Sequence, residues 1–222
     1  MRRNSFLFLQ GALICLLVSF AQARAQSDEV PRYEVGAQFT SITKPDFSGG
    51  ATEIGFGARF TFNLNKSVAL EATGNFFPHQ CNSCGRGQGD NNGNITEGLF
   101  GVKAGKRFQK WGIFAKGRPG FVSFSRGDSK YVATGAGGIF PFQFSQKRLT
   151  NFALDMGGVL EFYPSKRIVT RFEAGDTMIT YRRRETNFLL FDPVGGVTLV
   201  PFTLPGETRH NFQFTAGVGF RF

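Results

Sequence analysis

Residues 210–222 read HNFQFTAGVGFRF, and this stretch decides the predicted fold. From Phe212 to Phe222 every second residue is apolar, while the residues between them are polar, charged or glycine. A period of two is the spacing of side chains along a β-strand, because successive side chains point to opposite faces of the sheet. The stretch therefore predicts a strand with one apolar face and an aromatic residue at its end.

The same alternation recurs in earlier segments of the chain. It is regular at 33–40, 53–64, 68–76 and 152–162, and less regular at 95–107, 111–124 and 168–180. The 222 residues include 28 Phe and 29 Gly but only 9 Pro, with no strict period of three or seven, which excludes collagen and coiled coils. We therefore expect an all-β chain of eight strands.

The connections between these segments alternate in length. Tight turns are expected at 65–66, 108–110 and 164–167, and longer loops at about 43–51, 78–94, 125–150 and 181–209. Short turns at one end and long loops at the other are typical of an outer-membrane β-barrel. The even strand count places both termini on the short-turn, periplasmic side. The predicted fold is an eight-stranded antiparallel up-and-down transmembrane β-barrel.

A soluble sandwich or a lipocalin-like barrel is the alternative, with the apolar residues inside and the charges in water. Alternation alone does not say which face is inside. Glycines such as Gly55 and Gly217 share a face with the charges, and aromatic residues such as Tyr33 and Trp111 lie near strand ends. Both features favour the membrane barrel, because aromatic girdles mark the two lipid interfaces.

The N-terminus has the pattern of a secretory signal peptide. Arg2 and Arg3 precede an apolar run at 6–20, and small residues follow, with Ala25 as the expected cleavage position and Ala23 as the alternative. We therefore predict a signal peptide at 1–25 and a barrel domain at 26–222. Cleavage removes three arginines and lowers the formal charge from +10 to +7. The remaining basic residues are scattered and form no nucleic-acid motif, so no nucleic-acid partner is expected.

The terminal stretch 210–222 resembles the last strand of small outer-membrane barrels of the OmpA and OmpX type. The resemblance covers the predicted mature chain as a pattern but only this strand as a motif. In that family the closing strand ends in an aromatic residue that the outer-membrane assembly machinery recognises. The resemblance thus implies Phe220 and Phe222 as an assembly signal and the outer membrane of a Gram-negative bacterium as the location. We expect the protein to be a monomer.

The polar face of the predicted strands carries acids and bases in nearly equal number. They are Glu34, Glu53, Glu71, Glu97, Asp155, Glu161 and Glu173, with Arg59, Lys103, Lys116, Arg118, Arg171 and Arg221. Eight strands leave an interior just wide enough for side chains to fill. Unpaired buried charges would be costly, so we predict a packed salt-bridge network. A narrow or gated polar path is the alternative, because pores use the same residue types.

Two predicted loops carry further candidate sites. Cys81 and Cys84 form a CxxC near His79, and a disulfide is expected because the loop would face an oxidising compartment. Zinc is the alternative, but these residues supply only three ligands, and we predict no metal and no cofactor. The run Arg182, Arg183 and Arg184 is a candidate contact for lipopolysaccharide phosphates, with a solvated loop base as the alternative.

Catalysis is not expected, because neither of the two histidines, His79 and His210, is followed two residues later by a serine. The long loops carry apolar stretches at 139–144, 188–191 and 197–204. They would extend strands as hairpins, lie on the outer leaflet or form an entrance for a hydrophobic solute. An exposed apolar patch often marks an interaction site. We predict a structural and surface-interaction role, with lipid as a partner; the alternative is a narrow porin-like channel or a hydrophobic-solute transporter.

Overall fold

The computed structural model describes residues 30–44, 51–79, 93–133, 142–191 and 196–222. The predicted signal peptide at 1–25 and the predicted Cys81–Cys84 disulfide lie outside the described residues. The described part of the chain contains no helix with the length and hydropathy needed to cross a membrane.

Within the described ranges the chain forms ten strands. They are β1 (Tyr33–Lys44), β2 (Ala51–Asn63), β3 (Val68–Phe77), β4 (Ile95–Arg107), β5 (Trp111–Ala133), β6 (Phe142–Phe162), β7 (Ile168–Tyr181), β8 (Arg184–Phe191), β9 (Val197–Leu204) and β10 (Glu207–Arg221).

Eight of these strands close into a barrel in the order β1-β10-β7-β6-β5-β4-β3-β2, and each pairs antiparallel with its neighbours. The seam joins the two ends of the described chain: Tyr33 and Phe222 each donate a backbone N–H to the other's carbonyl, both at 2.9 Å. β8 and β9 form a separate two-stranded sheet between β7 and β10. The predicted eight-stranded antiparallel barrel is confirmed.

The two faces of the barrel wall follow the sequence alternation. Apolar side chains of the expected phase point outward; Phe39, for example, is 73% exposed and Ile54 is 70% exposed. Charged side chains of the opposite phase, such as Arg59 and Glu71, are buried inside. A soluble barrel would show the reverse arrangement, so the structure decides the question that the alternation left open. The outer wall is suited to hydrocarbon, in which a closed sheet satisfies every backbone group.

Tight turns at one end, which we call the short-turn end, have local chemical causes. Asn65 Oδ1 accepts hydrogen bonds from the backbone N–H groups of Ser67 and Val68, both at 2.8 Å. Ser165 Oγ accepts from the N–H of Arg167 at 3.3 Å and of Ile168 at 3.1 Å. Side chains that cap their own turn in this way fix short connections.

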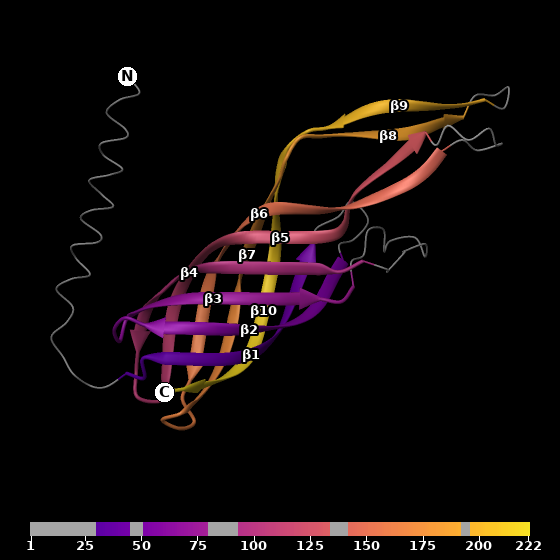
Figure 1. The fold of residues 1–222 in the computed structure, drawn as a ribbon. Coiled ribbons are helices and arrows are strands. Elements are labelled where there is room, and N and C mark those ends of the chain that lie inside the picture. The colour runs from indigo at the N-terminus through magenta and orange to yellow at the C-terminus, as the bar shows by residue number, and fades with distance from the viewer. Residues whose placement is uncertain (1–29, 45–50, 80–92, 134–141, 192–195) are drawn as a thin grey trace, which may run out of the picture.

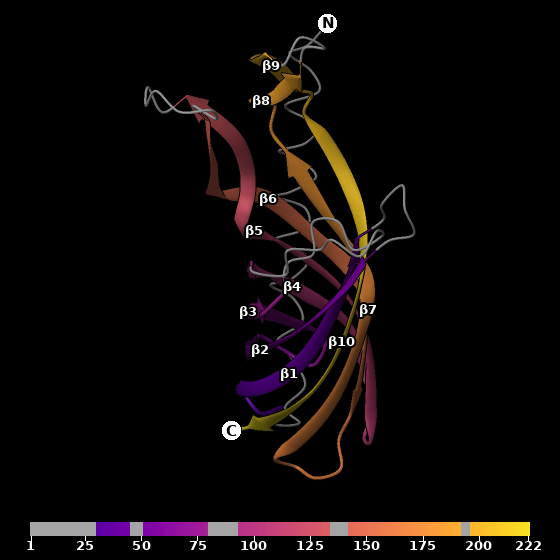
Figure 2. The ribbon, with the colours of Figure 1, turned by 90° about the vertical axis from the view of Figure 1, so that its right-hand side faces the viewer.

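The opposite end, which we call the hairpin end, differs from prediction. Most of the expected loop at 125–150 is strand, because β5 and β6 continue beyond the barrel after a register shift between Phe124 and Asp128. The expected loop at 181–209 contains the β8–β9 sheet. Figure 1 shows both hairpins projecting past the barrel, away from the C-terminus, and Figure 2 shows the same arrangement from the side. The described parts of the apolar stretches, 142–144, 188–191 and 197–204, lie in hairpins that extend beyond the barrel, which is one of the three possibilities. Residues 139–141 lie outside the described residues.

Candidate functional site

The barrel interior is built in layers along its axis, because each strand contributes an inward side chain at every second residue. A charged layer lies nearest the short-turn end, a layer of amides and hydroxyls follows, and an apolar layer closes the hairpin end. Of the predicted interior charges, ten belong to the charged layer: Glu34, Arg59, Glu71, Lys103, Lys116, Arg118, Asp155, Glu161, Arg171 and Glu173.

Glu71 on β3 lies at the centre of the charged layer. Arg171 on β7 donates two hydrogen bonds to its carboxylate, one of them from Nη2 to Oε2 at 2.7 Å. Lys103 Nζ lies 3.4 Å and Arg118 Nη1 lies 3.5 Å from the same carboxylate. All of these residues are buried. The pairing of Glu71 with Arg171 crosses the lumen, since β3 and β7 are not neighbours in the barrel.

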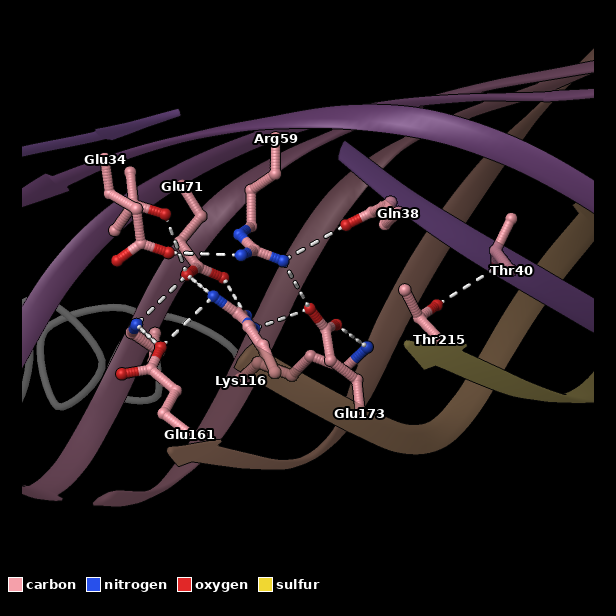
Figure 3. A network of polar contacts seen from close by, with 12 residues as sticks. Glu34, Gln38, Thr40, Arg59, Glu71, Lys116, Glu161, Glu173 and Thr215 are labelled. Atoms are coloured by element: carbon pink, nitrogen blue, oxygen red, sulfur yellow. Dashed lines mark hydrogen bonds and ion pairs between the residues drawn. The ribbon is translucent and has the colours of Figure 1, made fainter. Parts of the chain in front are cut away.

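Glu173 on β7 is a second centre. Its Oε2 accepts hydrogen bonds from Arg118 Nη2 at 2.7 Å and from Lys116 Nζ at 2.8 Å. Its Oε1 lies 2.7 Å from Arg171 Nε and 3.7 Å from Arg59 Nη1. Figure 3 shows these side chains converging from several strands into one connected set.

The remaining acids extend the set to the barrel wall. Arg118 and Lys116 lie 2.6 and 2.9 Å from Asp155 Oδ2. Arg59 Nη2 donates to Glu34 Oε1 at 3.1 Å. Glu161 accepts from Lys103, and its Oε1 lies 3.5 Å from Arg171 Nη1. Each carboxylate of the charged layer therefore has at least one cation beside it, which offsets the cost of taking it out of water.

Three predicted members lie elsewhere. Glu97 is buried in the neutral layer, where its Oε1 accepts from Asn75 at 2.5 Å and Gln213 at 3.1 Å, and no described ion pair includes it. Glu53 lies opposite Ile42, at the level of the apolar layer. Arg221 lies at the short-turn end and donates to the carbonyl of Ser165 at 3.2 Å. The sequence placed these residues on the correct face but could not give their height in the lumen.

The apolar layer was not predicted. It consists of buried inward side chains at the hairpin end: Ile42, Phe77, Ile95, Leu99, Val122, Phe124, Ala153 and Ile179, with Tyr181 packed against them. The sequence carried a signal at Phe76-Phe77, because two successive apolar residues on a strand place one on each face. The layer separates the charged interior from the hairpin end.

Arg107 and Tyr163 also belong to the interior, at its short-turn end, and sequence reasoning missed both. Arg107 Nε donates to Tyr163 Oη at 2.9 Å, and Tyr163 Oη donates to Glu161 Oε2 at 2.7 Å. Burial and the adjacent Glu161 carboxylate raise the pKa of the Tyr163 hydroxyl. The signal for Arg107 was its phase, since it lies four residues after Lys103 on the same strand face.

No protein-family model matches the chain, and no curated protein matches its sequence. Solved structures do match. Neisserial surface protein A superposes with a TM-score of 0.52 at 11% identity, over 86% of this chain and 97% of that one. The chain has the fold of a small outer-membrane β-barrel. This confirms the fold implied by the terminal strand.

Other small outer-membrane barrels are similar at lower scores. Ail of Yersinia pestis gives a TM-score of 0.46 at 12% identity, over 87% of this chain and 100% of that one. The outer membrane protein AlkL gives 0.41 at 13% identity, over 89% and 94%. At these identities the similarity concerns the fold.

At the hairpin end of this outer-membrane barrel, the three predicted arginines separate into two kinds. Arg182 and Arg183 are exposed. Arg184 begins β8, and its Nη1 donates to the backbone carbonyl of Gly127 at 2.6 Å. Arg184 therefore attaches β8 to the extension of β5.

The terminal aromatic residues lie on the outer wall at the short-turn end. Phe220 and Phe222 are exposed, and Phe222 stacks on Tyr33 with 5.9 Å between ring centroids. Phe108 stacks on Trp111 at 4.2 Å at the same end. These rings form part of an aromatic girdle of the kind that marks a lipid interface.

Two observations on the described residues concern metal binding and catalysis. They contain no group of three His, Cys, Asp or Glu side chains suited to a metal ion. His210 Nδ1 lies 2.5 Å from Asp176 Oδ2, but both side chains are exposed and His210 is on the outward phase of β10. This pair has no described serine or cysteine bonded to it.

Proposed function

We propose that this protein is a closed barrel in the outer membrane of a Gram-negative bacterium and that it acts through its outer surface. The observation that carries the proposal is the packed interior, in which the charged layer crosses the lumen and the apolar layer covers it. The short-turn end then faces the periplasm, and the two hairpins project outward. The predicted signal peptide supports this location.

Transport through the lumen is the less favoured role. A polar solute would have to separate ion pairs such as Glu71–Arg171 and then pass the apolar layer, where it would lose its hydration. An apolar solute would meet the charged layer. The two layers therefore oppose both kinds of solute, and this favours a surface role over a porin-like channel or a hydrophobic-solute transporter.

The two hairpins at the hairpin end supply the proposed contact surface. On β8 and β9 the side chains of Leu190, Phe191 and Phe202 are 56%, 65% and 47% exposed. Leu190 and Phe202 share one face of this projecting sheet, and Phe191 lies on the other. Exposed apolar groups on a projecting sheet are typical of a contact surface for lipid or a partner. The closed barrel has no free strand edge of its own, so the proposed unit is a monomer.

Lipopolysaccharide is the outer-leaflet partner that we propose, and Arg182 and Arg183 are the proposed contacts. Both are exposed beside the end of β7, and guanidinium groups bind phosphate through paired hydrogen bonds. Phe220 and Phe222, exposed at the end of the closing strand, are the proposed signal for the assembly machinery.

Replacing both Arg182 and Arg183 with alanine is expected to reduce the lipopolysaccharide that co-purifies with the barrel several-fold. Each charged hydrogen bond to phosphate contributes about 1.5–3 kcal/mol when formed. The matched control is Lys147→Ala with Arg148→Ala, which removes two exposed charges from β6 at the same end. Equal amounts of lipopolysaccharide on both variants and on the original chain would contradict the assignment.

A further inference from the structure

A cavity of about 1310 Å³ opens at the short-turn end of the barrel, below the charged layer. Five of its lining side chains are cationic: Lys66, Arg107, Lys110, Lys166 and Arg221. None of the described residues that line it is Asp or Glu. Cations gathered around one concave space raise the local concentration of anions, because the low-dielectric walls focus their field.

Two of these cations lie close together at the inner side of the cavity. The guanidinium groups of Arg107 and Arg221 both face the ring of Tyr163, at 5.5 and 4.3 Å from its centroid. Glu161 Oε2, 3.5 Å from Arg107 Nη2, is the one carboxylate in a described ion pair with either arginine. Arg221 is 6% exposed, and neither its Nε nor Arg107 Nη1 has a hydrogen-bond partner among the described residues. This end of the interior therefore holds positive charge that the described carboxylates do not balance.

The short-turn end as a whole has the same character. Its described turns and strand ends add Arg32, Lys106 and Arg167, and the described segments 30–33, 64–67, 106–111 and 163–167 contain no acidic residue. In the sequence, Asp28 and Glu29 come just before the first of these segments. The charged layer above it is different, since there every buried carboxylate has a cation beside it. Among the described residues, the excess of positive charge is thus concentrated at this mouth.

We propose that the cavity binds a polyvalent anion, a soluble molecule that carries several phosphate or carboxylate groups. Arg107 and Arg221 would bind one anionic group at the inner side, and Lys66, Lys110 and Lys166 would hold further groups at the rim. Single anions would gain little from so wide a space, whereas linked anionic groups reach several cations at once. Binding here requires an accessible mouth and does not depend on whether the lumen conducts.

The chain offers a reporter at the site. Trp111 is the single tryptophan of the sequence, and it lines the cavity beside Phe108. Its fluorescence in the barrel refolded in a neutral detergent can be followed while sodium tripolyphosphate is added at constant ionic strength. We expect a saturable change, with monovalent phosphate binding much more weakly, and the same affinity from isothermal titration calorimetry.

Charge-removing variants test the position of the site. The triple variant Lys66→Gln, Lys110→Gln and Lys166→Gln is expected to raise the Kd for tripolyphosphate at least about tenfold, which corresponds to about 1.4 kcal/mol. The matched control, Lys147→Gln, Arg148→Gln and Arg209→Gln, removes the same charge from exposed positions at the hairpin end and should leave the Kd unchanged. If the lysine variant fails to fold, Lys110→Gln alone, at an exposed position, replaces it.

A second arm separates a soluble anion from a lipid headgroup. Micelles doped with phosphatidylglycerol bring lipid phosphates to the short-turn end, where Arg32, Lys106 and Arg167 are exposed. If the cavity binds a soluble anion, the doped lipid should not compete with tripolyphosphate. Full competition by the lipid, no saturable binding of tripolyphosphate by either method, or equal Kd values for the two triple variants would overturn the proposal.

Discussion

Replacement of Arg171 by methionine is expected to lower the unfolding midpoint of the refolded barrel in detergent and to reduce its free energy of unfolding by about 3–5 kcal/mol. Arg171 is fully buried and lies beside Glu71, Glu161 and Glu173. Removing the cation leaves these carboxylates crowded in a low-dielectric interior with fewer partners. The loss is measured by thermal or urea unfolding, with the heat-shifted gel mobility of the folded barrel as the readout of the folded fraction.

The control for this variant is Arg209→Met, which breaks an ion pair with Glu207 in which both side chains are about half exposed, at 50% and 49%. Water screens such pairs, so a change below about 1 kcal/mol is expected. The double variant Glu71→Leu with Arg171→Met should recover part of the loss, because it removes one of the orphaned charges. Equal midpoints for Arg171→Met and Arg209→Met would contradict a packed charged layer.

Gly157→Val is expected to prevent most of the molecules from folding into the barrel. Gly157 on β6 lies opposite Gly175 on β7, on the inward phase. An added Cβ at Gly157 would lie 2.6 Å from the Cα of Gly175 and closer still to the carbonyl oxygen of Ala174. Backbone atoms in a barrel wall cannot move aside without breaking the hydrogen bonds between β6 and β7. We therefore expect the loss in free energy of unfolding to exceed the roughly 1–3 kcal/mol that overpacking usually costs.

The adjacent residue supplies the control. A Cβ at Gly158 meets nothing within 4 Å, because this glycine points outward. Gly158→Val adds the same side chain one position along the strand and should fold as well as the original chain. The folded fraction is read from gel mobility before and after heating. Similar folded fractions for Gly157→Val and Gly158→Val would contradict the described packing of β6 against β7.

The sequence was sufficient to divide each barrel strand into its two faces, because a strand shows its two faces directly in its period of two. Lys103 and Val102 show this: the charged residue is buried and its apolar neighbour is 40% exposed. The decision between a membrane and a soluble barrel needed more than the alternation. It came from glycines on the charged face and aromatics at strand ends.

The pairing inside the lumen was beyond the sequence. Glu71 and Arg171 are 100 residues apart and on strands that are not neighbours. Their contact depends on the stagger of all the strands between them, which a local pattern does not contain. For the same reason Glu97 could be placed on the inner face but not in the neutral layer, where it bonds Asn75 and Gln213.

The hairpin end shows a different limit. Alternation weakens after Phe124, where the register shifts, and the predicted loop at 125–150 hides two strand extensions. These extensions are held by pairing between β5 and β6 and by contacts such as Arg184 with Gly127. Beyond the barrel, the two faces of β5 and β6 do not separate hydrocarbon from a packed lumen. The alternation of apolar and polar residues is therefore not required there.

The conductance of the refolded protein in planar bilayers tests the closed interior most directly. Insertion is verified first, from quenching of Trp111 by lipids brominated along their chains, and a known porin in the same bilayer shows that currents would be detected. We expect a silent, inserted barrel, because the charged and apolar layers together fill the lumen. Stable, ion-selective current steps would contradict it and would make the buried acids and bases the walls of a pore.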